Sequence, residues 1–202
     1  ALPICHRAIL DCARSEAAKE GVRTLVFTFE PTPKEFFSPS TAPPRLTRFR
    51  ERFELLADIG IDDLLCPSFG AVRDLAPRTF IDDLLVGALR ARHVVVGDDF
   101  RFGANRQGTV NDLRAAGARH GFGVTEVAPV SWQGVRVSST AIREALQSGN
   151  LEGARGMLGR DYSMSGRVVR GLGLGRKLGF PTANVNLQRL KTPIDGIFAV
   201  RV

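Results

Sequence analysis

His93-Val94-Val95-Val96-Gly97 is the stretch that decides the predicted fold. It is a short, fully apolar run, and such runs are typical of strands that are buried on both faces. A helix at 77–90 precedes it, and a helix at about 109–120 and a strand at 122–127 follow it. Strands separated by helices of this length predict an α/β fold, with a parallel sheet and helices on both of its faces.

The same alternation runs through the rest of the N-terminal three quarters. Apolar periodicity and β-branched content predict further elements: helix 5–20, strand 22–29, helix 48–59, strand 63–66 and strand 132–137. The Pro- and Ser-rich stretch 31–44 predicts a loop or short turns. A parallel sheet binds its ligand beyond the carboxyl ends of its strands. The candidate site therefore lies among three loops, 29–37, 97–108 and 128–139.

Composition narrows the class of protein. The chain has 202 residues, 44% hydrophobic and 24% charged, which is typical of a globular protein and excludes a disordered or collagen-like chain. No run approaches the ~18 apolar residues of a membrane span, and the N-terminus lacks the pattern of a signal peptide. Cys5, Cys12 and Cys66 form no C-x-x-C pair, so we expect ordinary thiols in a reducing compartment, the cytoplasm.

Charge and glycine content change near residue 158. The net charge is +7, and residues 159–202 hold eight basic residues against two acidic ones, which points to a local anionic ligand. Four glycines between Gly171 and Gly179 predict neither helix nor regular strand. Residues 162–170 alternate like an exposed strand, and a further strand is predicted to begin at 199–202. We expect a domain boundary near 155–160.

The run from Val137 to Arg143 places two hydroxyls, Ser139 and Thr140, at the predicted start of a helix. Ser and Thr at such positions are often only caps. A helix N-terminus with free amides, hydroxyls and the Arg143 guanidinium is also a ready phosphate site. Both interpretations stay open from spacing alone.

Two other sets of residues could carry chemistry. His6 opens the first helix, where it is either structural or a donor to a phosphate. The stretch from Gly97 to Gly108 follows the buried strand with two carboxylates, two aromatic rings and three glycines. Such a loop either holds a planar heterocycle by stacking and hydrogen bonds or buries its rings in the core.

Several of these stretches, in order along nearly the whole chain, resemble one family, the prokaryotic bifunctional riboflavin kinase/FMN adenylyltransferases, also called FAD synthetases. The matching runs are residues 28–37, 96–103, 137–143, 175–184 and 195–200. The most specific is Gly179-Phe180-Pro181-Thr182-Ala183-Asn184. The resemblance implies FAD biosynthesis from riboflavin: ATP phosphorylates riboflavin to FMN, and AMP is then transferred from ATP to FMN, giving FAD and pyrophosphate.

The resemblance implies two domains with ATP, FMN and riboflavin as substrates and Mg²⁺ as cofactor. Residues 1–156 would form the FMN adenylyltransferase domain, a Rossmann-like nucleotidyltransferase sheet with an incomplete N-terminal signature. Residues 157–202 would form the N-terminal part of a β-barrel riboflavin kinase domain, whose general base lies further downstream in the family. We expect no nucleic acid or membrane partner, and the sequence predicts no particular oligomeric state.

The resemblance also assigns residue roles in the first domain. Ser139, Thr140 and Arg143 would hold the β- and γ-phosphates of ATP. His6 would stabilise charge on the reacting phosphates, so His6 and Arg143 are the expected catalytic residues. The flavin-binding stretch corresponds to Asp99, Phe100 and Phe102, and the loop 31–33 matches a Pro-x-Pro element near the phosphates.

In the second domain, the resemblance assigns Thr182 and Asn184 to Mg-ATP, with Gly175 in the phosphate-wrapping loop. This sequence departs from the family pattern at three positions. Pro3 stands where the signature has a His, Cys5 where it has a Gly, and Thr32 where a His is common.

Two other functions compete with this reading. The basic tail permits a nucleic-acid-binding module, which steep salt dependence of oligonucleotide binding would reveal. A single-activity adenylyltransferase for another phosphorylated substrate is the second, and the Pro-Thr-Ala-Asn segment speaks against it.

Overall fold

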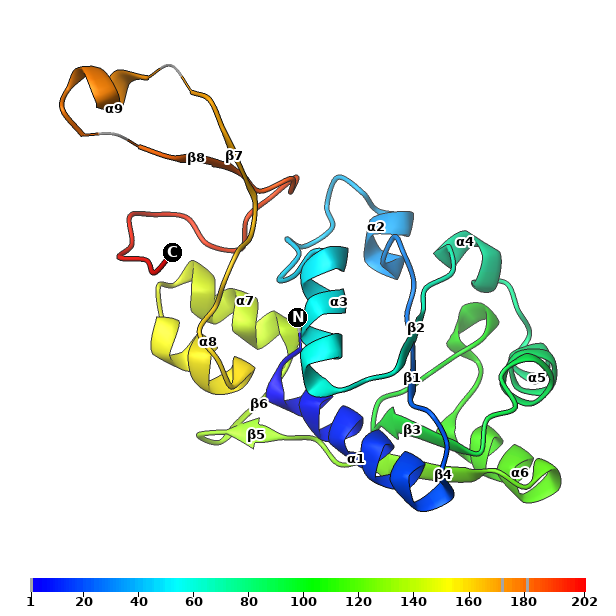
Figure 1. The fold of residues 1–202 in the computed structure, drawn as a ribbon. Coiled ribbons are helices and arrows are strands. Elements are labelled where there is room, and N and C mark those ends of the chain that lie inside the picture. The colour runs from blue at the N-terminus through cyan, green and yellow to red at the C-terminus, as the bar shows by residue number, and fades with distance from the viewer. Residues whose placement is uncertain (1, 172, 181) are drawn as a thin grey trace.

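The computed structural model describes residues 2–171, 173–180 and 182–202 and has a mixed α/β fold (Figure 1). The α-helices are α1 (Ile4–Glu20), α2 (Pro33–Phe37), α3 (Phe49–Ile59), α4 (Phe69–Val72), α5 (Pro77–Thr79), α6 (Val110–His120), α7 (Ser139–Gln147), α8 (Leu151–Leu158) and α9 (Leu174–Lys177). A π-helix, η1 (Phe80–Ala88), continues α5, and a 3-10 turn, η2 (Ala104–Arg106), precedes α6. Within the described residues, no helix combines the length and the apolar character needed to cross a membrane.

The strands of the described ranges form four two-stranded pairs. They are β1 (Leu25–Phe27), β2 (Asp63–Leu65), β3 (His93–Gly97), β4 (Gly123–Val127), β5 (Ser131–Trp132), β6 (Val135–Arg136), β7 (Arg167–Val169) and β8 (Asn184–Asn186). β1 pairs with β2, and β3 pairs with β4, in parallel, so the predicted parallel pairing is present in two separate pairs. The β5–β6 and β7–β8 pairs are antiparallel.

Helices cover both faces of the β3–β4 pair. Successive side chains of a strand point to opposite faces. On one face, His93 lies 3.8 Å from Glu16 of α1, and Gly97 faces Ile9 of the same helix. On the other face, Val96 joins the core beneath α6 and η1. The edge where β3 and β4 end is therefore flanked by the amino end of α1.

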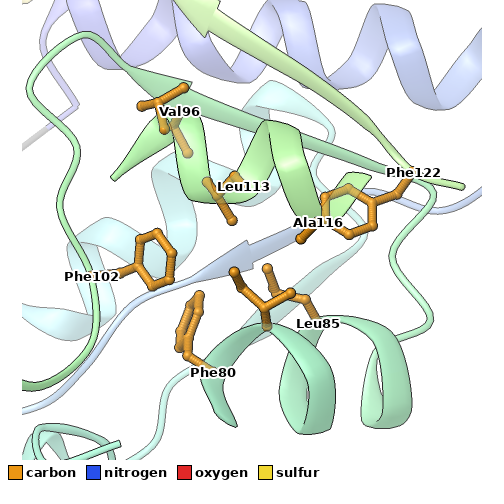
Figure 2. Close-up of a cluster of buried hydrophobic side chains, with 9 residues drawn as sticks. Phe80, Leu85, Val96, Phe102, Leu113, Ala116 and Phe122 are labelled. Carbon is orange, nitrogen blue, oxygen red and sulfur yellow. The ribbon is translucent and has the colours of Figure 1, made fainter. Parts of the chain in front are cut away.

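The main core lies between η1, β3 and α6 (Figure 2). Leu113 and Ala116 of α6 are fully buried there, and Phe80, Phe102 and Phe122 pack around them. Burying a side chain of Leu or Phe size is worth about 1.5–3 kcal/mol each, so this cluster stabilises the base from which the loop after β3 projects.

A second core joins the last part of the chain to the first. Ile142 and Leu146 of α7 are buried with Leu46 and with residues of α8. Tyr162 and Ile194, from the segment after α8, pack against the same cluster. The glycine-rich segment around α9 projects away from the rest of the chain (Figure 1).

The predicted strand at 132–137 is wrong. The chain forms a tight hairpin there, in which Trp132 pairs with Val135. Gln133 and Gly134 have φ of 47° and 79°, the left-handed conformation that the two central residues of a type I′ turn require. Gln133-Gly134 is a weaker turn signal than Asn-Gly, so the sequence pattern does not reveal the turn.

Two predictions for the last part of the chain also fail. Residues 199–202 are not a strand, and exposed side chains such as Val200 have no strand partner among the described residues. The glycine-rich segment contains one turn of helix, α9, and its Gly175 carbonyl accepts bonds from the amides of Leu178 and Phe180, just after the helix.

Candidate functional site

A pocket of about 450 Å³ opens where β3 and β4 end, at the edge the sequence predicts. Four segments line it, from the amino end of α1, the ends of β3 and β4, and the amino end of α7. The lining residues are Cys5, His6, Ile9, Gly97, Asp98, Asp99, Phe100, Val127, Ala128, Pro129, Val130, Arg136, Val137, Ser138 and Ser139. Four predicted site residues are thus brought together: His6, Asp99, Phe100 and Ser139.

Two helix amino ends converge on this pocket. The first amides of an α-helix have no acceptor within the helix, and the helix dipole places partial positive charge there. Neither α1 nor α7 carries an acidic residue in its first turn that would neutralise this charge. His6 lies in the first turn of α1 and Ser139 begins α7. This wall of the pocket therefore suits an anion such as phosphate.

Ser138 is the cap of α7, since its Oγ accepts a hydrogen bond from the Ala141 amide at 3.1 Å. The adjacent serines at the start of α7 therefore differ in what they contact. Ser138 is committed to capping, while Ser139, the first residue of the helix, lines the pocket without being the cap.

The loop after β3 supplies a charged and an aromatic side of the pocket. Arg136 donates from Nη2 to both carboxylate oxygens of Asp98 at 2.9 Å, which neutralises that carboxylate and ties the β5–β6 hairpin to the loop. Asp99 is exposed at the pocket wall. The Phe100 ring lines the pocket and stacks on Phe102, with centroids 5.7 Å apart and planes at 20°.

Phe102 does not line the pocket. Its side chain is 6% exposed and belongs to the main core, where it packs against Phe80 (Figure 2). Phe102 and Gly108 exchange backbone hydrogen bonds of 3.1 and 2.8 Å, which close the loop and turn the ring inward. A Cβ at Gly108 would lie 2.7 Å from this ring, so only glycine fits there. Phe102 therefore lies behind Phe100 and away from the pocket lining, and its predicted flavin contact stays a prediction.

Thr140 and Arg143 lie beside the pocket rather than in its lining. Thr140 is exposed next to Ser139. Arg143 is half-buried one turn further on, and its Nε donates to the Pro44 carbonyl at 2.7 Å while Nη1 donates to the Ser139 carbonyl at 3.1 Å. Burial lowers the pKa of Arg143 from its ordinary value.

Two polar residues that line the pocket, Arg136 and Cys5, were not predicted as site residues. Arg136 precedes the Ser138 cap by two residues, and its position at the end of a strand-like segment was the available signal. Cys5 stands in the first turn of α1, where burial raises the pKa of its thiol and keeps it protonated. The Pro-x-Pro loop lies elsewhere, since Pro31 lines a different pocket and Thr32 caps α2.

The predicted kinase residues, Gly175, Thr182 and Asn184, belong to the segment from β7 to β8, which projects away from β3 and β4 (Figure 1). A Cβ on Gly175 would lie 2.3 Å from the Phe180 carbonyl oxygen and 3.0 Å from Thr182 Oγ1, so the chain closes tightly there. Asn184 begins β8, and its amide fills the space beside Gly171. Leu172 and Pro181, which belong to the same motifs, lie outside the described residues.

Comparison with known families agrees with this arrangement. Residues 4–141 match the family model described as FAD synthetase. The chain belongs to the FAD synthetase family. Residues 158–202 match a second model, described as riboflavin kinase.

Curated relatives of this family cover nearly the whole chain. The bifunctional riboflavin kinase/FMN adenylyltransferase of Escherichia coli (strain K12) is 46% identical over 98% of this chain. The proteins of the same name from Pseudomonas fluorescens and Haemophilus influenzae are 42% and 38% identical over 98% of the chain. The chain spans 63% of the length of the Escherichia coli and Pseudomonas relatives and 64% of the Haemophilus one.

A solved structure has a similar fold. The crystal structure of a protein described as a macrolide-efflux protein from Streptococcus pneumoniae superposes with a TM-score of 0.80 at 29% identity. The likeness covers 96% of this chain and 64% of that chain. The likeness in fold therefore includes residues after α8.

Proposed function

We propose that residues 1–156 catalyse transfer of AMP from ATP to FMN and that residues 157–202 are the N-terminal part of a riboflavin kinase domain. A phosphate oxygen of FMN forms a bond to the α-phosphorus of ATP, and the bond from that phosphorus to the bridging oxygen breaks. FAD and pyrophosphate are the products. The observation that carries the proposal is the convergence of two helix amino ends and the Asp99–Phe100 loop on one pocket of a FAD synthetase family member.

The chemistry of the pocket wall supports the adenylyltransferase step. The transfer develops negative charge on the phosphates, and fixed donors that meet this charge lower the barrier. We assign the β- and γ-phosphates to Ser139, Thr140 and Arg143, at the amino end of α7. His6, at the amino end of α1, would donate to the reacting phosphates. The reaction then depends on positioning and charge neutralisation, without a covalent enzyme intermediate.

The aromatic side of the pocket suits the flavin. Phe100 offers a ring face at the pocket, and Phe102 supports that ring from behind by stacking. Asp99 is placed to accept hydrogen bonds from the flavin ring edge. A pocket of about 450 Å³ lies within the usual size of small-molecule sites, about 300–1,000 Å³.

The two parallel strand pairs and their covering helices support a Rossmann-like nucleotidyltransferase domain for the first part. The β7–β8 hairpin supports the beginning of the kinase barrel. We also place the protein in the cytoplasm, since the three cysteines are free thiols and ATP is a substrate.

Magnesium is the implied cofactor, and the chemistry of the kinase residues fits it. Mg²⁺ prefers oxygen ligands and is usually held by one or two protein groups together with substrate phosphates. The Thr182 hydroxyl and the Asn184 amide oxygen would hold it, beside the tight turn at Gly175. When bound with ATP, the ion neutralises phosphate charge. Among the described residues, no group of three or more His, Cys, Asp and Glu could form a metal site of the protein alone.

The test is product formation from FMN, ATP and Mg²⁺, with FAD separated by chromatography and pyrophosphate measured by a coupled assay. We expect FAD and pyrophosphate in equal amounts, and no product when EDTA removes the metal. The assay is run on this chain and on a chain extended to the length of the curated relatives. A folded, extended chain that makes no FAD would overturn the proposal.

A further inference from the structure

One buried arginine, Arg189, joins the segment after α8 to the first part of the chain. The Arg189 side chain is 2% exposed. Its Nη2 donates to Glu51 Oε2 of α3 at 2.5 Å, and its Nη1 donates to the Arg45 carbonyl at 2.7 Å. An arginine fork that satisfies two acceptors at once fixes both their positions, because its donors are rigidly planar.

Glu51 is the acceptor that most of the hydrogen bonds in this contact share. Its Oε1 accepts from the Ser165 amide and hydroxyl at 2.9 Å, and its Oε2 also accepts from the Arg48 amide at 2.7 Å. Burial alone would raise the pKa of Glu51, but these bonds and the one from Arg189 lower it below the ordinary value. The carboxylate is therefore charged at neutral pH. Two separate parts of the tail, at Ser165 and Arg189, meet on it.

Arg189 and Arg143 donate hydrogen bonds to neighbouring carbonyls of the same backbone segment. The Pro44 carbonyl accepts from Arg143 Nε at 2.7 Å, and the next carbonyl along, that of Arg45, accepts from Arg189 Nη1. Leu46, the following residue, is 3% exposed and packs with Ile142 of α7. Three consecutive residues thus connect the tail to the helix whose amino end faces the pocket.

We propose that Arg189, from the riboflavin kinase segment, is a positioning residue for Arg143 and so for nucleotide binding at the adenylyltransferase site. The proposal rests on the proposed function, in which Arg143 contacts the ATP phosphates. Arg189 touches no substrate in this scheme. It holds the Arg45 peptide, which fixes the direction of the neighbouring Pro44 carbonyl and thereby the guanidinium of Arg143.

The physical reason is that adjacent peptide units move together. If Arg189 releases the Arg45 carbonyl, the segment from Pro44 to Leu46 loses one of its fixed points, and the Arg143 guanidinium loses its defined orientation. Misplacement of a phosphate donor by about an ångström weakens its interaction strongly. Coupling between sites through such contacts commonly changes affinity about fivefold or more.

The variants separate this role from simple stabilisation. Arg189→Lys keeps a positive charge near Glu51, but one ammonium group cannot reproduce the planar fork that reaches both Glu51 and the Arg45 carbonyl. Lys191→Ala is the matched control, since Lys191 also joins the tail to the first part, by a bond to the Ser40 carbonyl at 2.8 Å. That bond lies outside the Pro44–Leu46 segment. Thermal melting of each variant confirms that it is folded.

The first measurement is the affinity for α,β-methylene-ATP with Mg²⁺, by calorimetry, in the extended chain. We expect Arg189→Lys to bind about fivefold more weakly than the wild type, and Lys191→Ala to bind equally. In a cycle with Arg143→Gln, the double variant should bind like Arg143→Gln alone, because both changes remove the same interaction. Unchanged affinity in Arg189→Lys, or losses that multiply in the double variant, would overturn the proposal.

The second measurement needs no nucleotide and separates this proposal from the proposed function. The Arg143 Nε–H signal in ¹⁵N NMR spectra reports its bond to the Pro44 carbonyl. We expect Arg189→Lys to shift or broaden that signal and Lys191→Ala to leave it in place. A wild type that binds no nucleotide but has this NMR response contradicts the proposed function alone. An Arg143 signal that ignores Arg189→Lys contradicts the positioning role.

Discussion

Arg143 makes two structural hydrogen bonds next to the site where we propose that it binds phosphate. Its Nε and Nη1 are held by the Pro44 and Ser139 carbonyls, which orient the group beside the amino end of α7. A donor oriented before the substrate arrives costs little reorganisation when charge develops on the phosphates. These contacts would therefore favour the phosphate role that we propose for Arg143.

Replacing Arg143 by alanine should therefore cost about 2–4 kcal/mol of transition-state stabilisation, the scale for loss of one preorganised donor. The measurement is kcat/KM for FAD formation. Arg119→Ala, an exposed arginine in the last turn of α6, is the matched control and should leave the rate unchanged. An adenylyltransferase rate in Arg143→Ala equal to that of this control would remove Arg143 from the site.

Glu35 organises the loop that follows β1. Its carboxylate accepts bonds from the Thr32 amide at 3.0 Å and the Thr32 hydroxyl at 2.9 Å, and it pairs with Arg45. Hydrogen bonds from Arg45 are the main reason that the pKa of the Glu35 carboxyl is lowered to about 2. Because the folded-state pKa lies below the unfolded one, this group stabilises the fold above about pH 4.5, and the contribution is lost as the pH falls toward 2.

We expect Glu35→Gln to lower the free energy of unfolding by about 2 kcal/mol at pH 7, the scale of charged hydrogen bonds. The difference from the wild type should shrink between about pH 4.5 and pH 2, since only the wild type loses this charge. Urea denaturation at pH 7 and pH 3 measures both values. A difference of the same size at the two pH values would refute the assigned role of the Glu35 charge.

At the scale of elements, helix α8 lies against the β5–β6 hairpin through a glycine. A Cβ on Gly156 would lie 2.1 Å from Trp132 Cε2, so the indole ring occupies the space of a side chain. This close approach is what lets the hairpin pack beside α7 and α8 at the edge of the pocket.

Gly156→Ala should destabilise the protein by about 1–3 kcal/mol, because the indole ring must move to admit a methyl group. Equilibrium urea unfolding followed by Trp132 fluorescence measures the loss. Arg155→Ala, an exposed neighbour on the same helix, should change stability by no more than about 0.5 kcal/mol. A stable Gly156→Ala variant with wild-type fluorescence would contradict the packing of Trp132 on α8.

The elements that periodicity predicts well are those with a clear apolar pattern in their own sequence. Helices α1, α3 and α6 and strands β3 and β4 lie within one or two residues of their predicted ends. Strand β1 is shorter than predicted, Leu25–Phe27, because only three residues pair with β2. The β5–β6 hairpin was missed because a Gln133-Gly134 turn carries a weaker signal than Asn-Gly.

The sequence predicts the candidate site as far as it predicts where the strands end and the helices begin. His6, Asp99, Phe100 and Ser139 reach one pocket because each sits at such an end. Phe102 differs from Phe100 by two residues, and only the backbone bridge to Gly108 decides that its ring turns into the core. The tail contact of Arg189 with Glu51 joins residues 138 positions apart, which no local pattern indicates.

At the scale of the whole molecule, the residues proposed for the two activities lie in different parts of the chain. In the part of the chain that the structure describes, no residue after Ser139 lines the pocket at the ends of β3 and β4, whereas the proposed kinase residues lie in the segment from β7 to β8. The two sites should therefore respond independently to changes in their own residues, apart from the link through Arg189.

In a chain extended to the length of the curated relatives, Asn184→Ala should slow riboflavin phosphorylation roughly 10–100-fold and spare FMN adenylylation. Asn186→Ala, in the same strand, is the control and should affect neither reaction strongly. The two products, FMN and FAD, are separated by chromatography in parallel assays. Equal loss of both activities in Asn184→Ala would mean that the sites are not separate.

The most direct test of the account is a crystal structure with FMN, α,β-methylene-ATP and Mg²⁺ bound. We expect triphosphate oxygens within hydrogen-bond distance of Ser139 and the first-turn amides of α7, with the flavin ring against Phe100. A nucleotide bound elsewhere, with the amino end of α7 bare, would contradict it.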